Sequence, residues 1–131
     1  MNGAQAYLWV GLGGFLGANA RYFVGNWLIG RLGGGWPYHT FLINITGGLA
    51  IGCILTLLTA RPSADPAWRL FLVVGLLGGY TTFSSYTFEG LALIRAGDWL
   101  GAAAYLLGSN LLGLFATFLG LVLARALGAL F

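Results

Sequence analysis

The chain has 131 residues, of which 59% are hydrophobic and only 7% are charged, and its mean hydropathy is +0.87. A soluble domain carries about a quarter charged residues, so an independently soluble globular fold is excluded. The formal net charge of +3 comes from six Arg residues spread over the whole length, a distribution that does not indicate nucleic-acid binding. We therefore expect an all-α integral membrane protein in contact with membrane lipid.

The first of four expected membrane spans covers about residues 6–29. A spanning helix needs about 20 mostly apolar residues, and this run contains one internal charge, Arg21. Residues 1–5 are uncharged and the apolar stretch continues beyond the length of a signal peptide, so cleavage is not predicted. The span ends at residues 31–37, where three glycines and a proline break the helix.

Three further apolar runs follow, at about residues 38–60, 67–94 and 99–123. A loop with two prolines and two charged residues, 61–66, separates the second run from the third. Because the spans leave little mass outside the membrane, we expect one four-helix transmembrane domain over residues 1–131.

The third run is not expected to be a continuous helix. Residues 78–85 contain two adjacent glycines and five hydroxyl side chains, so we expect two half-helices separated by a break. Non-helical backbone at membrane depth survives only where it is buried in protein or lines a cavity. The break would leave carbonyl oxygens without hydrogen-bond donors, and a small cation could bind to them. The alternative is a glycine kink in which the threonine hydroxyls donate to these carbonyls.

Small residues recur four positions apart in the first two spans: Gly13 and Gly17, Gly14 and Ala18, and Gly48 and Gly52. This spacing lets helix backbones approach closely in lipid. We therefore expect close helix packing at most of these positions.

The six Arg residues divide evenly between the two faces expected for four spans. One face carries Arg61, Arg69 and Arg125, and the other carries Arg21, Arg31 and Arg95. Orientation follows the Lys and Arg bias of short loops, so an even split favours insertion in both orientations and an antiparallel two-fold dimer. The alternative is that such small counts are even by chance.

Polar side chains inside the spans indicate function, because lipid tolerates them only where they face protein or water. Asn44 lies in the second span, with Thr40 one turn earlier. A neutral carboxamide offers two N–H donors without a fixed charge, which suits an anion that must be held and released. The alternative is an interhelical hydrogen bond.

The fourth span carries a row of hydroxyl and small residues. Tyr105, Ser109, Gly113 and Thr117 recur every four residues, with Asn110 beside them, and this spacing places them along one helix face. We interpret the face as a hydroxyl track, the alternative being a chance row of packing residues.

Few residues could support enzyme chemistry. The chain has one His and one Cys, and its three acids, Asp65, Glu89 and Asp98, are far apart in sequence, so neither a catalytic triad nor a metal cluster is predicted. His39 is expected at the membrane interface. Proton-coupled exporters use an intramembrane carboxylate, and Glu89 is the only candidate.

Three motifs resemble those of the Fluc/CrcB fluoride channels. Residues 14–22, Gly-Phe-Leu-Gly-Ala-Asn-Ala-Arg-Tyr, are similar to the family's Gly-x-x-Gly-Ala-x-x-Arg-Tyr signature. Residues 40–47 are similar to its Asn-x-x-Gly motif, and residues 78–84 to its Gly-Gly-x-Thr-Thr-Phe-Ser break. The motifs occur in the family's order, and the resemblance covers essentially the whole chain.

The resemblance implies an antiparallel dual-topology homodimer with two fluoride pores, through which fluoride leaves a microbial cell passively across its plasma membrane. It also implies a structural Na⁺ on the two-fold axis, held by the backbone carbonyls of Gly78 and Thr81. By position, the implied pore residues are Asn44, Phe83, Tyr86, Thr40, Tyr105, Ser109 and Ser84, with Arg21 in the vestibule.

The sequence departs from the family's pattern at two positions. Tyr86 stands where the family usually has a second phenylalanine, and Phe88 lies two residues further, on a different helix face. Tyrosine keeps the positive ring edge and adds a hydroxyl that could donate to fluoride or narrow the pore. Gly113 stands where the fourth span often has a hydroxyl.

Two other functions fit parts of the pattern. A small dual-topology exporter of cationic or organic solutes would use Glu89 as its coupling acid. A membrane subunit that only scaffolds a partner would need neither Asn44 nor Phe83 for fluoride resistance.

Overall fold

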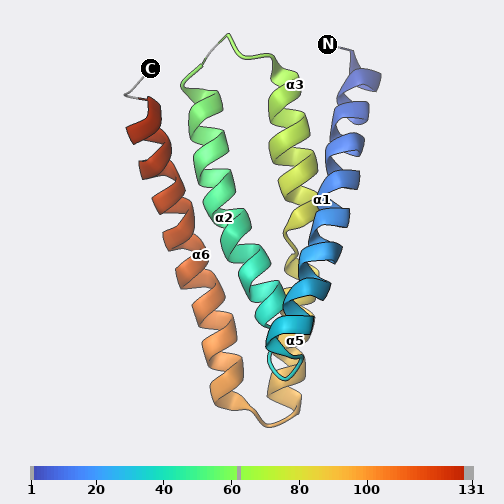
Figure 1. The fold of residues 1–131 in the computed structure, drawn as a ribbon, viewed down its shortest axis with the longest axis vertical. Coiled ribbons are helices and arrows are strands. Elements are labelled where there is room, and N and C mark those ends of the chain that lie inside the picture. The colour runs from blue at the N-terminus through green and yellow to red at the C-terminus, as the bar shows by residue number, and fades with distance from the viewer. Residues whose placement is uncertain (1, 62, 129–131) are drawn as a thin grey trace.

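The computed structural model describes residues 2–61 and 63–128, which form four antiparallel helical rods (Figure 1). The start of α1 and the end of α6 lie at the same end of the molecule, because the four rods alternate in direction (Figure 1). No strand occurs within the described ranges, so the all-α expectation is confirmed. In chain order the elements are α1 (Gly3–Leu32), α2 (Tyr38–Thr59), then α3 (Pro66–Trp68), η1 (Arg69–Leu77), α4 (Gly78–Tyr80) and α5 (Phe83–Arg95), which together form the third rod, and α6 (Trp99–Gly128).

Local sequence signals set the ends of the rods. The Asn2 side chain accepts the Gln5 N–H at 2.9 Å, and the Gln5 side chain accepts the Asn2 N–H at 3.0 Å. This capping box begins α1 earlier than the expected boundary at residue 6. Gly33 follows α1 with a φ of +79°, a backbone conformation that glycine adopts without steric cost. The last helix also runs further than expected, to Gly128 rather than residue 123.

Glycines bring α1 against the third rod. A Cβ added to Gly75 would lie 2.7 Å from the carbonyl oxygen of Val10, and one added to Gly79 would lie 2.7 Å from that of Gly14. An added Cβ at Gly17 would collide with the carbonyl oxygen of Leu76. The two backbones therefore touch directly, and the close packing predicted for the first span is confirmed.

A second glycine contact joins α2 to α6. A Cβ on Gly48 would lie 3.1 Å from the carbonyl oxygen of Gly113, and one on Gly52 would collide with the carbonyl oxygen of Thr117. Gly120 faces Leu49 in the same way. The molecule is thus two tightly packed helix pairs, α1 with the third rod and α2 with α6.

Among the described residues, three helical stretches are long and apolar enough to cross a membrane: Tyr38–Thr59, Pro66–Arg95 and Trp99–Gly128. α1 is equally long but less apolar, because it carries Asn19 and Arg21 along with several glycines. Large apolar side chains, such as Phe15 on α1, are exposed on the outer surface of the chain. These features indicate a multi-pass membrane protein.

The third rod is interrupted at Thr81 and Thr82, whose backbones are extended with φ/ψ of −78°/160° and −148°/119°. The predicted break is therefore confirmed, and it is two residues long. Just before it, the turns of η1 are wide, so that the Gly78 N–H bonds to the Val73 carbonyl five residues back. Such π-helical turns are frequent at functional sites.

Candidate functional site

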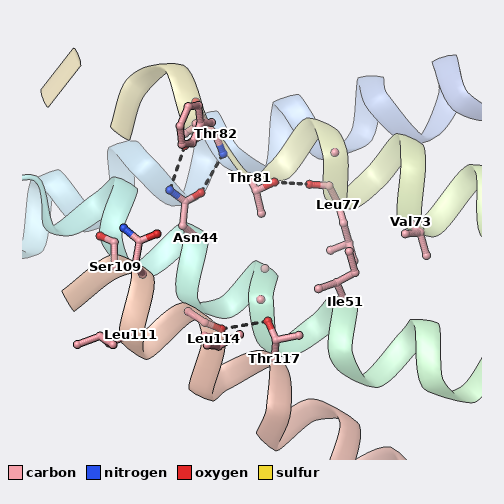
Figure 2. Close-up of a pocket in the computed structure, with 16 residues that line it drawn as sticks. Asn44, Ile51, Val73, Leu77, Thr81, Thr82, Ser109, Leu111, Leu114 and Thr117 are labelled. Carbon is pink, nitrogen blue, oxygen red and sulfur yellow. Dashed lines mark hydrogen bonds between the residues drawn. The ribbon is translucent and has the colours of Figure 1, made fainter. Parts of the chain in front are cut away.

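Asn44 on α2 holds the break in the third rod. Its Nδ2 donates to the Thr82 carbonyl at 3.0 Å, and its Oδ1 accepts the Thr82 N–H at 2.9 Å (Figure 2). In a continuous helix the Thr82 N–H would bond to the carbonyl of Gly78. Asn44 therefore pairs both backbone polar groups of one residue, Thr82, across the break. This contact is the interhelical hydrogen bond that the sequence analysis gave as the alternative.

Thr81, the first residue of the break, also makes hydrogen bonds that stabilise the break. Thr81 donates both its N–H and its hydroxyl to the Leu77 carbonyl, at 3.0 and 2.9 Å. The Thr81 carbonyl accepts from Arg21 Nη1 at 3.5 Å. Gly78 is exposed in the protomer, and its carbonyl lacks the helical donor that Thr82 would supply. The break thus leaves the Gly78 carbonyl without its helical donor, whereas the Thr81 carbonyl has Arg21 beside it.

A first cavity of about 710 Å³ opens between α2, the third rod and α6 (Figure 2). The Ser109 hydroxyl on its wall is buried and has no hydrogen-bond partner among the described residues. The Thr117 hydroxyl, in contrast, donates to the Gly113 carbonyl at 3.0 Å. The polar residues of the wall include Asn44, Thr81, Thr82, Ser109, Asn110 and Thr117.

Phe83 lies on the wall of this cavity and is 77% exposed in the protomer. Its ring centroid is 5.7 Å from that of Tyr86. The Tyr86 hydroxyl donates to the Leu106 carbonyl at 3.1 Å and accepts from Asn110 Nδ2 at 2.6 Å. Tyr86 therefore ties α5 to α6, and its hydroxyl proton is already used within the protein. Ser84 is exposed, with its hydroxyl 3.5 Å from that of Thr82.

A second cavity of about 440 Å³ lies on the other side of the break, between α1, α2 and α5. Thr82 belongs to the walls of both cavities, so they meet at the peptide that Asn44 holds. The second wall is strongly polar and includes Arg21, Asn26, His39, Thr40, Ser85 and Glu89.

Glu89 is the hydrogen-bonding centre of the second cavity. Its carboxylate accepts the Thr40 hydroxyl at 2.9 Å and the Tyr105 hydroxyl at 2.6 Å, and His39 Nε2 lies 3.3 Å from it. Tyr105 is completely buried. The structure thus brings Thr40 and Tyr105 together at Glu89, and it separates Tyr105 from Ser109, which belongs to the first cavity.

His39 was expected at the membrane interface, and its side chain lies against Glu89 on the wall of the second cavity. Asn26 and Ser85 belong to the same wall and were not predicted as site residues. The one available signal was that Glu89, the only acid inside a span, needs donors around it in lipid.

The chain is similar to known proteins over nearly its whole length. The family model described as "CrcB-like protein, Camphor Resistance (CrcB)" matches residues 8–121. The fluoride-specific ion channel FluC of Acidobacterium capsulatum is 48% identical over 124 residues, covering 94% of this chain and 98% of that protein. FluC proteins of Thermus thermophilus and Chloroflexus aurantiacus are each 46% identical, over 95% and 91% of this chain and 98% and 94% of their own lengths. The chain belongs to the CrcB family.

Proposed function

We propose that this chain is a fluoride-selective channel, which lets fluoride leave a microbial cell passively across the plasma membrane and so lowers fluoride toxicity. The observation that carries the proposal is the buried Ser109 hydroxyl, a donor without a partner among the described residues, on the wall that also holds Asn44 and Phe83. Relatives that share almost half of its sequence are named fluoride-specific ion channels. In this account the protein transports an ion and is not an enzyme.

The two cavities together supply the chemistry that fluoride needs. A fluoride ion must exchange its water for hydrogen-bond donors, and Asn44 keeps one N–H beyond the one given to Thr82. Ser109 adds its hydroxyl, and the exposed ring edge of Phe83 carries partial positive charge without binding an anion tightly. Several weak contacts in series let an ion leave as readily as it arrives.

The other residues that the sequence predicts for the pore lie beside the proposed fluoride path rather than in it. Thr40 and Tyr105 hold Glu89 on the wall of the second cavity, where Arg21 attracts anions electrostatically. Tyr86 fixes its ring beside Phe83 through the bonds to α6. Ser84, one residue after Phe83, is exposed toward a partner subunit.

We further propose that α1 is a fourth membrane span and that two chains associate as an antiparallel dual-topology homodimer with two pores. Three features support this assembly: the equal division of Arg residues between the two ends of the rods, the first cavity's open side, and the exposure of Phe83 and Gly78 beside it. A partner subunit would close the open wall and cover both residues.

A structural Na⁺ at the dimer interface fits the break. The Gly78 carbonyl has lost its helical donor, and neutral carbonyl oxygens are ligands that hard cations prefer. The carbonyl of Thr81 fits less simply, because Arg21 lies within 3.5 Å of it. When bound, Na⁺ would add a fixed positive charge near the pores, where a low dielectric extends its effect.

Fluoride efflux from liposomes containing the purified full-length protein tests the function. We expect fluoride release that needs no proton gradient, with chloride release near that of empty liposomes. Fluoride release no faster than from empty liposomes would contradict the proposal. Release that occurs only with a proton gradient would indicate a coupled exporter, with Glu89 as the coupling acid.

A further inference from the structure

We infer that His39, when protonated, is an additional anion contact in the second cavity, so that fluoride flux rises as the pH falls. The inference rests on the proposed function, and it concerns the only histidine of the chain. His39 stands at the start of α2, and its side chain is about a quarter exposed, at 27%. It is therefore within reach of protons from water.

The two ring nitrogens of His39 have different surroundings. Nε2 lies 3.3 Å from Glu89 Oε1, and this contact is an ion pair when the ring is protonated. Nδ1 is buried and has no partner within the part of the chain that the structure describes. In the protonated ring both nitrogens are donors, and the one at Nδ1 has no acceptor among the described residues. A small anion beside the ring would supply that acceptor.

The charges around His39 decide the effect of this proton. Glu89 faces it from α5, Arg21 and Tyr22 belong to the cavity wall on α1, and Tyr105 reaches Glu89 from α6. With a neutral His39, the charges of Arg21 and Glu89 cancel. With a protonated His39, the cavity carries one net positive charge.

Histidine is the side chain whose charge ordinarily changes between pH 5 and 8. A cleft of one charge sign raises the local concentration of the oppositely charged ion, by about tenfold or more. Because the His39 and Glu89 side chains are partly exposed, water screens their charges. We therefore expect the gain in local fluoride concentration to be about tenfold or less. Since protonation aids fluoride binding, fluoride binding must equally aid protonation.

The test measures fluoride efflux from liposomes that have the same pH on both sides, at about pH 5.5 and about pH 8. Fluoride remains ionised over this range, and empty liposomes correct for leakage as HF. Two variants are compared with the full-length wild type. His39→Gln places an uncharged donor near Glu89, and His39→Lys is positive at both pH values.

We expect wild-type efflux to be roughly fivefold to tenfold faster at the lower pH. His39→Gln should be slow and His39→Lys fast at both pH values. Wild-type efflux that does not change with pH, or a His39→Gln variant that keeps the wild-type response, would overturn the inference alone. If no fluoride efflux occurs at both pH values, the proposed function is overturned, and the inference with it.

A measurement on the wild type does not depend on the variants folding. Because the chain has one histidine, its ring signal in an NMR spectrum of the lipid-reconstituted protein belongs to His39. At a constant pH in the titrating range, added fluoride should increase the protonated share of this signal more than added chloride does. An identical signal with both anions would contradict an anion contact at His39.

Discussion

Asn44 is the residue on which the break depends. Both of its side-chain bonds go to the two polar groups of Thr82, so α2 supplies what the interrupted rod has lost. Sequence alone placed Asn44 in a span and Thr82 in a break. Their pairing could not be predicted, because it depends on how two helices distant in sequence align in space.

Replacing Asn44 with Ala should therefore destabilise the protein. Leaving a buried donor or acceptor unpaired costs about 1–3 kcal/mol, so we expect the free energy of unfolding to fall by roughly 2–6 kcal/mol for the two groups of Thr82. Equilibrium unfolding in detergent measures this change. The matched control is Asn19→Ala, since exposed Asn19 bonds only within its own helix and should change stability by about 0.5 kcal/mol or less. Equal effects of both substitutions would contradict the role assigned to Asn44.

Phe83 and Phe88 allow a second comparison at the residue scale. Both rings are about three-quarters exposed on α5, at 77% and 75%, but only Phe83 lies on the wall of the first cavity. Phe83→Ile removes the polarised ring edge, so fluoride efflux should fall at least about tenfold. Phe88→Ile should retain efflux within about twofold of the wild type. A similar loss in both variants would show that the ring at Phe83 is not a specific ion contact.

At the scale of the elements, much of the architecture could be predicted. The lengths of the apolar runs predicted the four rods, and the adjacent glycines and threonines predicted the break. The wide turns of η1 could not be predicted, because no residue type encodes them. They occur where η1 packs against the glycines of α1, which is a contact between distant segments. The grouping of Thr40, His39 and Tyr105 at Glu89 likewise depends on three helices meeting.

The direct backbone contact between α1 and η1 predicts opposite outcomes for two glycine substitutions. A Cβ on Gly75 would lie 2.7 Å from the Val10 carbonyl, whereas one on Gly11 would meet nothing within 4 Å. Gly75→Ala should lower the free energy of unfolding by about 1–3 kcal/mol through overpacking. Gly11→Ala should raise it by about 0.5–1 kcal/mol, because alanine is the better helix former. Chemical unfolding in detergent gives both values, and a stabilising Gly75→Ala would contradict the contact.

At the scale of the whole molecule, the proposed dual-topology dimer rests on the distribution of Arg residues. Three fall on each of the two expected membrane faces, although Arg21 reaches the break rather than a loop, and an even split gives orientation no charge bias. Tags on both termini should therefore be accessible from both sides of the membrane. A single orientation in the wild type would contradict the dual-topology dimer and favour a heteromeric assembly.

Added charge should shift this balance. Ser63→Lys combined with Ala64→Lys places two more positive charges in the loop between α2 and α3, and the tags should then be accessible mainly from one side. Fluoride resistance of the cell should fall in parallel, because antiparallel partners become scarce. The same positions changed to Gln serve as the control and should leave both orientations populated.

The most direct test of the account is the current that the wild-type protein carries across a planar lipid bilayer with different fluoride and chloride concentrations on the two sides. We expect a current whose reversal potential equals the fluoride equilibrium potential and stays the same when the chloride or proton gradient is changed. A reversal potential that follows chloride or protons, or a bilayer with no fluoride current, would contradict a fluoride-selective channel.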